Sequence, residues 1–123
     1  MTACVFCQPA NQHYVVENDV AGMLYDTHPV TPGHALIVTK QHTATFFKTS
    51  LEVQVGMLAL LPKVKAIIDA NYHPAGYNLD VNIGRAGGQA IMHTHLHVIP
   101  RYRHDQLSTN QPIQRQLPAG LPG

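Results

Sequence analysis

Short stretches in the first third of the chain concentrate apolar side chains in a way that predicts strands. Residues 13–17 are rich in β-branched and aromatic side chains and precede a turn-forming Asn-Asp pair. Residues 21–26 are expected to return beside them as a second strand. The prolines within 29–33 cannot donate to a ladder and predict a loop, after which 34–39 form a largely buried strand with His34 at its entry.

Between residues 43 and 71 the pattern changes to the spacing of a helix. Ser50 is the expected start, and Pro62 predicts a kink or two abutting helices, because proline removes a backbone donor inside a helix. Apolar residues recur here at steps of three and four, which predicts one face turned towards a sheet. The residues expected on that face are Leu51, Val55, Leu58, Ala59, Ile67 and Ile68.

The rest of the chain predicts two more strands and a tail. Residues 77–83 and 91–100 have the composition of strands, and the glycine-rich run 84–89 between them predicts a tight turn whose amides can approach an anion. Residues 102–123 are polar and proline-rich, so we expect them to be loosely ordered or to lie across a partner subunit. Residues 1–101 are then one domain.

These elements predict an α+β fold. We expect an antiparallel sheet of about five strands, helices covering one face, and the strand over 91–100 at or near the centre. With 123 residues, the chain is long enough for one domain and too short for two comfortable ones.

The composition limits the kinds of partner that we expect this protein to bind. Only 12% of the residues are charged, against about a quarter in ordinary soluble proteins, which indicates a buried subunit interface. The net charge is +1 and no basic run is present, so we expect no nucleic-acid partner. No apolar stretch approaches the roughly 20 residues that cross a bilayer, and no signal pattern begins the chain, so we expect a cytoplasmic protein without membrane contact.

The nine histidines draw attention to His93, His95 and His97. On a strand these three side chains project to one face at intervals of roughly 6.6 Å, beside the glycine-rich turn. They could be three satisfied surface imidazoles or a metal site alone. Phosphate chemistry fits the neighbouring turn better, because an imidazole is largely neutral at pH 7 and attacks phosphorus to form a reactive phosphoramidate. His95 would then need a fixed acceptor, such as a backbone carbonyl, for its second nitrogen.

The segment His93–Ile99 resembles the His-x-His-x-His-x-x signature of the histidine triad (HIT) nucleotide-binding family. The similarity extends from about Cys4 to Arg101. The other matching positions, in order, are Asp26, Pro32-Gly33-His34, Leu36-Ile37-Val38, Lys40-x-His42, Asn82-x-Gly84 and Gly87-Gly88-Gln89. Thr94 is a minor departure, since the family usually has an apolar residue there.

The resemblance implies an enzyme in which His95 attacks the α-phosphorus of a nucleotide and forms a nucleotidyl-histidine that water hydrolyses. His97 and His34 would complete the phosphate site. Asp26 would bind the ribose hydroxyls, while Asn82, Gln89 and the amides around Gly88 would contact phosphate or ribose. Without the resemblance, Asp26 would be interpreted as a turn cap and Asn82 as support for the bend at Gly84.

Cys4 and Cys7 are three positions apart, which by itself is weak evidence for a metal site. The resemblance implies that this pair joins His42 and His93 in a structural zinc site, as in some bacterial family members. Four such ligands close a tetrahedral site and leave no position for substrate water. A redox or regulatory protein built on exposed, reactive thiols is the alternative.

The predicted function is therefore a hydrolase that releases a nucleoside monophosphate from dinucleoside polyphosphates or nucleoside phosphoramidates. A purine nucleotide is the expected substrate, and the resemblance implies a homodimer. The alternatives are a nucleotidyltransferase and a nucleotide-binding interaction module in which hydrolysis is incidental.

Overall fold

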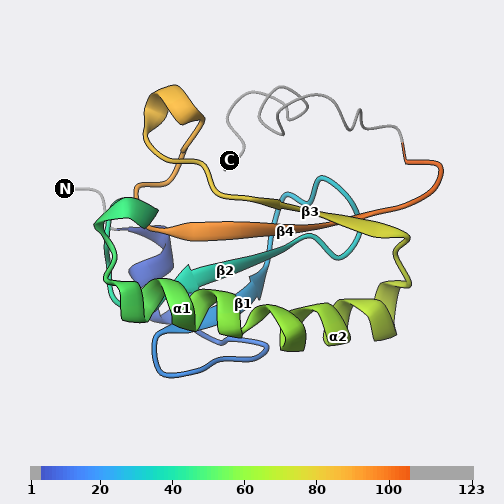
Figure 1. Cartoon of the computed structure of the whole chain (residues 1–123), viewed down its shortest axis with the longest axis horizontal. Helices are drawn as coiled ribbons and strands as arrows, with labels where there is room; N and C mark the ends of the chain where they lie inside the picture. The colour runs from blue at the N-terminus through green and yellow to red at the C-terminus, as the bar shows by residue number, and fades with distance from the viewer. Residues whose placement is uncertain (1–3, 106–123) are drawn as a thin grey trace.

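The fold is built on a four-stranded antiparallel sheet, as seen in a computed structural model that describes residues 4–105 (Figure 1). The strands are β1 (Ala21–Tyr25), β2 (Ala35–Thr39), β3 (Gly76–Asp80) and β4 (His95–Arg101). Their order in the sheet is β1-β2-β4-β3, so β2 and β4 are the inner strands, and both are buried along their whole length. This confirms the antiparallel α+β class and places the histidine strand at the centre.

The segment 13–17 does not form the additional strand that its composition predicts. It makes a single bridge, Glu17 to Gly22. Val15 donates to the carbonyl of Met23, and the Met23 amide donates to the carbonyl of Val16, so two residues oppose one as in a β-bulge. A regular ladder cannot continue through that arrangement, and the sheet has four strands instead of about five.

The helical region consists of two abutting helices, as Pro62 predicts. They are α1 (Leu51–Ala59) and α2 (Leu61–Tyr72), which lie nearly end to end along one face of the sheet (Figure 1). Ser50 caps α1, since its hydroxyl accepts a hydrogen bond from the amide of Val53 at 3.2 Å. Pro62 lies in the first turn of α2, where a missing amide proton costs nothing.

The helix face that packs on the sheet is not the predicted one. The fully buried helix residues are Met57, Leu60, Val64 and Ile68, of which only Ile68 was expected. Leu51, Val55 and Leu58 are instead 74%, 56% and 50% exposed. Ala59 is also exposed and Ile67 is half-buried. Apolar residues occur around most of α1, so spacing alone does not select the face that the sheet covers.

The strands that flank the site are shorter than predicted, which leaves chemically important residues in loops. β3 ends at Asp80, so Asn82 lies beyond it, and β4 begins at His95, so His93 precedes it. Short 3-10 turns fill the connections: η1 (Val5–Cys7), η2 (Pro9–Asn11), η3 (Phe46–Lys48) and η4 (Arg85–Gly87). Of the predicted tail, residues 106–123 lie outside the described part. Within residues 4–105, neither helix is long and apolar enough to span a bilayer.

Candidate active site and metal centre

His95, the first residue of β4, is held by the backbone just before it. Its Nδ1 lies 2.8 Å from the carbonyl oxygen of His93. A carbonyl can only accept, so Nδ1 carries the proton and Nε2 keeps its lone pair. The structure therefore provides the backbone acceptor that a nucleophilic His95 requires.

His34 and His97 form a buried hydrogen-bonded pair beside His95. The amide of Val30 donates to Nδ1 of His34 at 3.1 Å, so the proton of His34 is on Nε2. That Nε2 donates to Nδ1 of His97 at 2.9 Å, which places the proton of His97 on its own Nε2. Burial, with smaller effects of His97 and His95, lowers the pKa of His34 to about 3, so this side chain stays neutral at pH 7.

Asp26 has two oxygens with different surroundings. Oδ1 accepts from the amide of His28 at 2.9 Å and so caps a turn, as the simpler interpretation of the sequence holds. Oδ2 is buried without a hydrogen bond and lies 3.6 Å from Nε2 of His34. A buried carboxylate oxygen without a donor is costly, and substrate hydroxyls would satisfy it.

The glycine-rich turn is tight, as predicted, and Gln89 holds it together. Gly84 and Gly88 have positive φ angles of 73° and 91°, which residues with a Cβ rarely adopt. Oε1 of Gln89 accepts from the amide of Gly84, and its Nε2 donates to the carbonyls of Ala44 and Ile91. The Gln89 side chain thus supports the turn from within the protein.

Asn82 lies in the loop between β3 and this turn. Its Nδ2 is buried and has no hydrogen-bond partner within the described residues. A buried amide donor without an acceptor is a group that an oxygen-rich ligand can satisfy.

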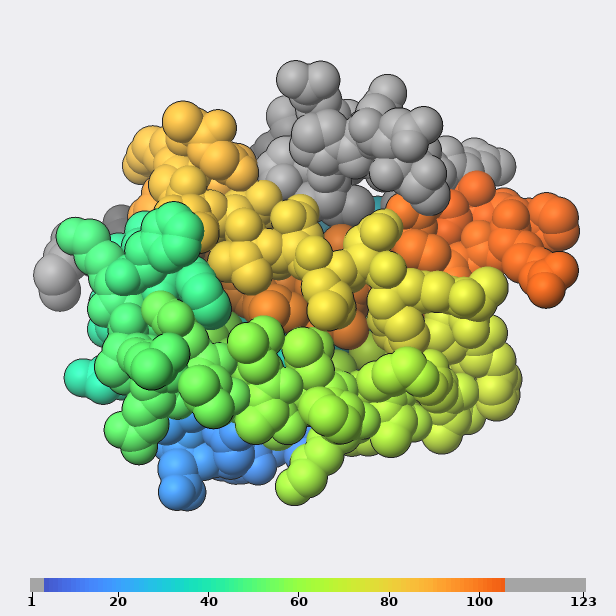
Figure 2. Space-filling model, viewed as in Figure 1, coloured from blue at the N-terminus to red at the C-terminus, as the bar shows by residue number. Residues whose placement is uncertain are grey.

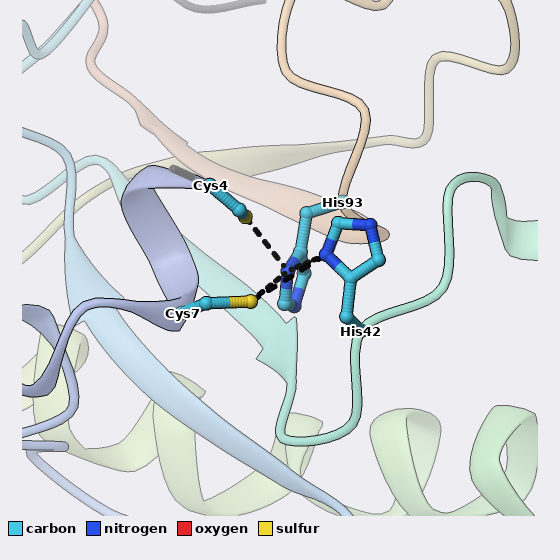
Figure 3. A group of neighbouring side chains, drawn as sticks. All are labelled: Cys4, Cys7, His42 and His93. Carbon is cyan, nitrogen blue, oxygen red and sulfur yellow. Dashed lines mark hydrogen bonds between the residues drawn. The ribbon is translucent and has the colours of Figure 1, made fainter. Parts of the chain in front are cut away.

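The four predicted metal ligands come together from three separate segments (Figure 3). Cys4 precedes the turn η1 and Cys7 ends it, His42 follows β2, and His93 precedes β4. Their ligand atoms all lie within 4.8 Å of one another. Nε2 of His93 is 2.7 Å from the carbonyl of Thr39, so its Nδ1 keeps a lone pair that faces the cluster.

The distances within this cluster suit a tetrahedral ion. Nδ1 of His93 is 3.2 Å from Sγ of Cys4, 3.6 Å from Sγ of Cys7 and 3.2 Å from Nδ1 of His42. Sγ of Cys7 is 3.5 Å from Nδ1 of His42. Zinc bonds to nitrogen and sulfur imply ligand separations of about 3.3 to 3.8 Å, so the residues fit a zinc ion. Burial also lowers the pKa of His93, which favours its neutral, metal-binding form.

A small apolar pocket of about 160 Å³ lies beside Asp26. Its lining residues come from the N-terminal segment, from β1 and β2, and from the loop before β4. They are Val5, Phe6, Ala10, Asn11, Leu24, Tyr25, Asp26, Thr27, Leu36 and Ile91. The sequence pattern did not predict this pocket. The available signal was the apolar pair Val5-Phe6 between the two cysteines.

Comparison with known proteins agrees with this geometry. The model of the HIT domain family matches residues 8–104. The chain belongs to the HIT family. The two cysteines precede the matched segment.

Two solved structures of HIT proteins show the same fold. A HIT family protein from Bacillus anthracis is 30% identical, with a TM-score of 0.78, covering 94% of this chain and 86% of that one. A zinc-bound histidine triad family protein from Mycobacterium smegmatis is also 30% identical, with a TM-score of 0.77 and coverage of 93% and 87%.

Among sequence relatives, the adenylylsulfatase HINT3 of Arabidopsis thaliana is 36% identical over 118 residues. The alignment covers 91% of this HIT chain but only 59% of that relative, so the chain spans little more than half of its length.

Proposed function

We infer that this HIT protein is a nucleotide hydrolase that works through a covalent nucleotidyl-histidine on His95. The observation that carries the proposal is that His95 and His97, two residues apart on β4, hold their protons on different ring nitrogens. His95 has its lone pair on Nε2, and His97 has its proton on Nε2. Displacement at phosphorus needs a nucleophile, and a hydrogen bond to the departing atom stabilises the charge that builds there.

In the first step, the lone pair of His95 Nε2 attacks the α-phosphorus. The bond from phosphorus to the leaving group breaks, His97 Nε2 donates a hydrogen bond to the departing atom, and the leaving group takes its proton from solvent. In the second step water attacks the phosphorus, the phosphorus–nitrogen bond breaks with its electron pair returning to His95 Nε2, and the water releases a proton to solvent. His34 holds the tautomer of His97 through both steps by donating to its Nδ1.

The nucleotide is bound by the groups that lack partners around the histidines. Oδ2 of Asp26 accepts from the ribose hydroxyls, and Nδ2 of Asn82 donates to a phosphate oxygen. The amides at Gly88 stabilise charge building on phosphorus, while Gln89 contributes by holding that turn. The apolar pocket beside Asp26 takes the base, and a purine offers it the larger apolar face.

Several leaving groups on the α-phosphorus are compatible with this reaction. Dinucleoside polyphosphates and nucleoside phosphoramidates are candidates, because both place a displaceable group on the α-phosphorus. The name of the Arabidopsis relative adds adenylyl sulfate, a mixed anhydride with the same α-phosphorus. The hydrogen bond from His97 matters most for the amine, which is the most basic of these leaving groups.

The test is to mix the protein with each substrate class, quench early, and measure the intact mass. We expect a nucleotidyl adduct and released monophosphate with wild type, no adduct with His95→Ala, and an unchanged result with the exposed-site control His13→Ala. Transfer of the nucleotidyl group to added phosphate would indicate a transferase. Binding without adduct or turnover on any substrate would contradict the proposal and favour a binding module.

We further infer that the Cys4, Cys7, His42 and His93 cluster holds zinc in a structural role. Four protein ligands complete the tetrahedron, and the ion would fasten the N-terminal turn to the loops before β4 and after β2. One zinc per chain by metal analysis, lost in His42→Ala, is the expected result.

We propose a homodimer that forms over the part of the sheet that the helices do not cover. Between the helices and β3, the surface has an apolar hollow of about 490 Å³ (Figure 2). Its lining residues are Leu58, Leu61, Pro62, Lys65, Tyr77, Leu79 and Val98. Leu79 is 55% exposed there, on the edge strand of the sheet. We expect a dimer by light scattering, a monomer for Leu79→Glu, and a dimer for the control Leu51→Glu, which lies outside the hollow.

A further inference from the structure

The short segment that carries both cysteines also forms a wall of the base pocket. Val5 and Phe6, between the cysteines, line the pocket together with Ala10 and Asn11. Other lining residues come from the sheet, including Leu24 of β1. One stretch of eight residues therefore belongs at once to the metal cluster and to the nucleotide site.

Phe6 is the residue that touches both sites. Its ring centroid lies 5.5 Å from that of the metal ligand His93, in an edge-on arrangement, and 5.4 Å from that of His95. The side chain is only 7% exposed and packs with Leu36 and Val38 of the sheet. A displacement of Phe6 would therefore change the pocket wall and remove an aromatic contact from the nucleophile.

The segment is attached to the rest of the protein mainly through its thiols and through Phe6. Within the described residues, the backbone hydrogen bonds of the segment stay inside it or reach the adjacent Gln12: the Cys7 amide donates to the Cys4 carbonyl, and the Asn11 side chain donates to the Val5 carbonyl. The thiols of Cys4 and Cys7, by contrast, reach His93 and His42. Thiol–imidazole contacts are weak hydrogen bonds, whereas bonds to a divalent ion would fix the same atoms firmly.

We propose that metal occupancy of the cysteine–histidine cluster sets the affinity of the pocket for the nucleoside, with Phe6 as the positioning residue that links the two sites. The inference rests on the proposed nucleotide site and goes beyond it. With the metal bound, Phe6 is held against His95 and closes the pocket. Without it, the wall loosens and the nucleoside loses part of its contact. Linkage then requires that the nucleotide tighten metal binding by the same factor.

The first measurement is the affinity for AMP, the reaction product, in zinc-loaded and chelator-treated protein by titration calorimetry. We expect at least a tenfold loss on zinc removal, and an equal gain in zinc affinity when AMP is saturating. The matched variants are Phe6→Ala and Leu24→Ala, which remove lining side chains of the pocket that come from different elements. Both should weaken AMP binding, but only Phe6→Ala should reduce the dependence on metal.

A second measurement needs no metal-free protein. In the cobalt(II)-loaded full chain, saturating AMP should shift the visible absorption bands of the thiolate-bound ion in wild type and Leu24→Ala, and leave them unchanged in Phe6→Ala. Unchanged bands in AMP-saturated wild type, or equal AMP affinity with and without zinc, would overturn the coupling alone. If metal-loaded wild type does not bind AMP, the proposed nucleotide site fails, and the coupling fails with it.

Discussion

Two clusters of side chains that could bind a metal ion lie near His95, and they differ in their hydrogen bonds. One is the cysteine–histidine cluster, and the other contains Asp26, His34 and His97. In each, the ligand atoms are within 4.8 Å of one another. In the cysteine cluster, Nε2 of His93 donates to the Thr39 carbonyl, so the lone pair of Nδ1 faces the cluster. In the cluster of Asp26, His34 and His97, both nitrogens of His34 are hydrogen-bonded. Its Nδ1 accepts from the Val30 amide, and its Nε2 donates to His97.

Proximity of ligand atoms is therefore insufficient to identify a metal site. A cation needs lone pairs, and the cysteine cluster can present two thiolates and two imidazole nitrogens at suitable separations. A metal at His34 would have to displace a hydrogen bond that fixes the tautomer of His97. The first cluster is thus suited to hold an ion, and the second to present a hydrogen-bond donor.

The greatest loss of activity should follow from removing His97. His97→Ala should lower kcat by about 10² to 10³ for an amine leaving group, because the charge on the departing nitrogen loses its hydrogen bond. For a leaving group that is stable as an anion, the loss should be much smaller. Steady-state kinetics on both substrates, with His13→Ala as control, measures the ratio. Equal losses on the two substrates would show that His97 does not act on the leaving group.

Next in size is the loss of stability when the cysteine cluster is broken. His42→Ala should abolish stoichiometric zinc and cost about 4 kcal/mol where free zinc exceeds its Kd a thousandfold, lowering Tm by more than about 10 °C. Calorimetric melting beside metal analysis checks this, with the exposed His104→Ala as the matched variant. A folded His42→Ala protein should keep more kcat than His97→Ala. A reversed order would contradict the division of roles.

A pH titration of stability should report on the buried His34. Its pKa is about 3 in the folded protein and near 6.5 in the unfolded chain, so the unfolded state binds more protons between these values. The stabilising contribution is full above pH 6.5 and is lost as pH falls towards 3, at up to about 1.4 kcal/mol per unit. The free energy of unfolding in urea is measured against pH in the His42→Ala background, where metal release does not contribute to the pH dependence. Adding His34→Asn should make this pH dependence flatter.

The matched control in that same background is His13→Asn, at an exposed position. An equal slope with and without His34→Asn would mean that His34 does not titrate differently on folding.

The smallest effect should come from Asp26→Asn. The amide oxygen still accepts from His28 and preserves the turn, while the negative acceptor for the ribose is lost. We expect KM for a ribonucleotide to rise about threefold to tenfold, the size of one or two hydrogen bonds. A 2′,3′-dideoxy substrate should show no comparable rise. A similar rise for both substrates would place the role of Asp26 outside ribose binding.

Much of the local structure could be predicted from the order of residues alone. Strand composition located β1, β2, β3 and β4 to within a few residues, and the family resemblance pointed to His95 and the cysteine–histidine set. The cap at Ser50 and the break at Pro62 follow from interactions between near neighbours in the chain, which is why local chemistry sufficed to predict them.

Three features could be seen only in the folded structure: which side of the helices is buried, where the strands end, and which nitrogen of each histidine carries the proton. Each of these features depends on residues that are far away in the sequence. Met57 is buried by the sheet, while Leu58 beside it is left exposed. The proton of His97 is placed by His34, 63 residues earlier, and Phe6 meets His95 only because the N-terminal segment folds back against β4. Spacing along the chain describes a residue's neighbours on its own element, and the chemistry of this site depends on neighbours from others.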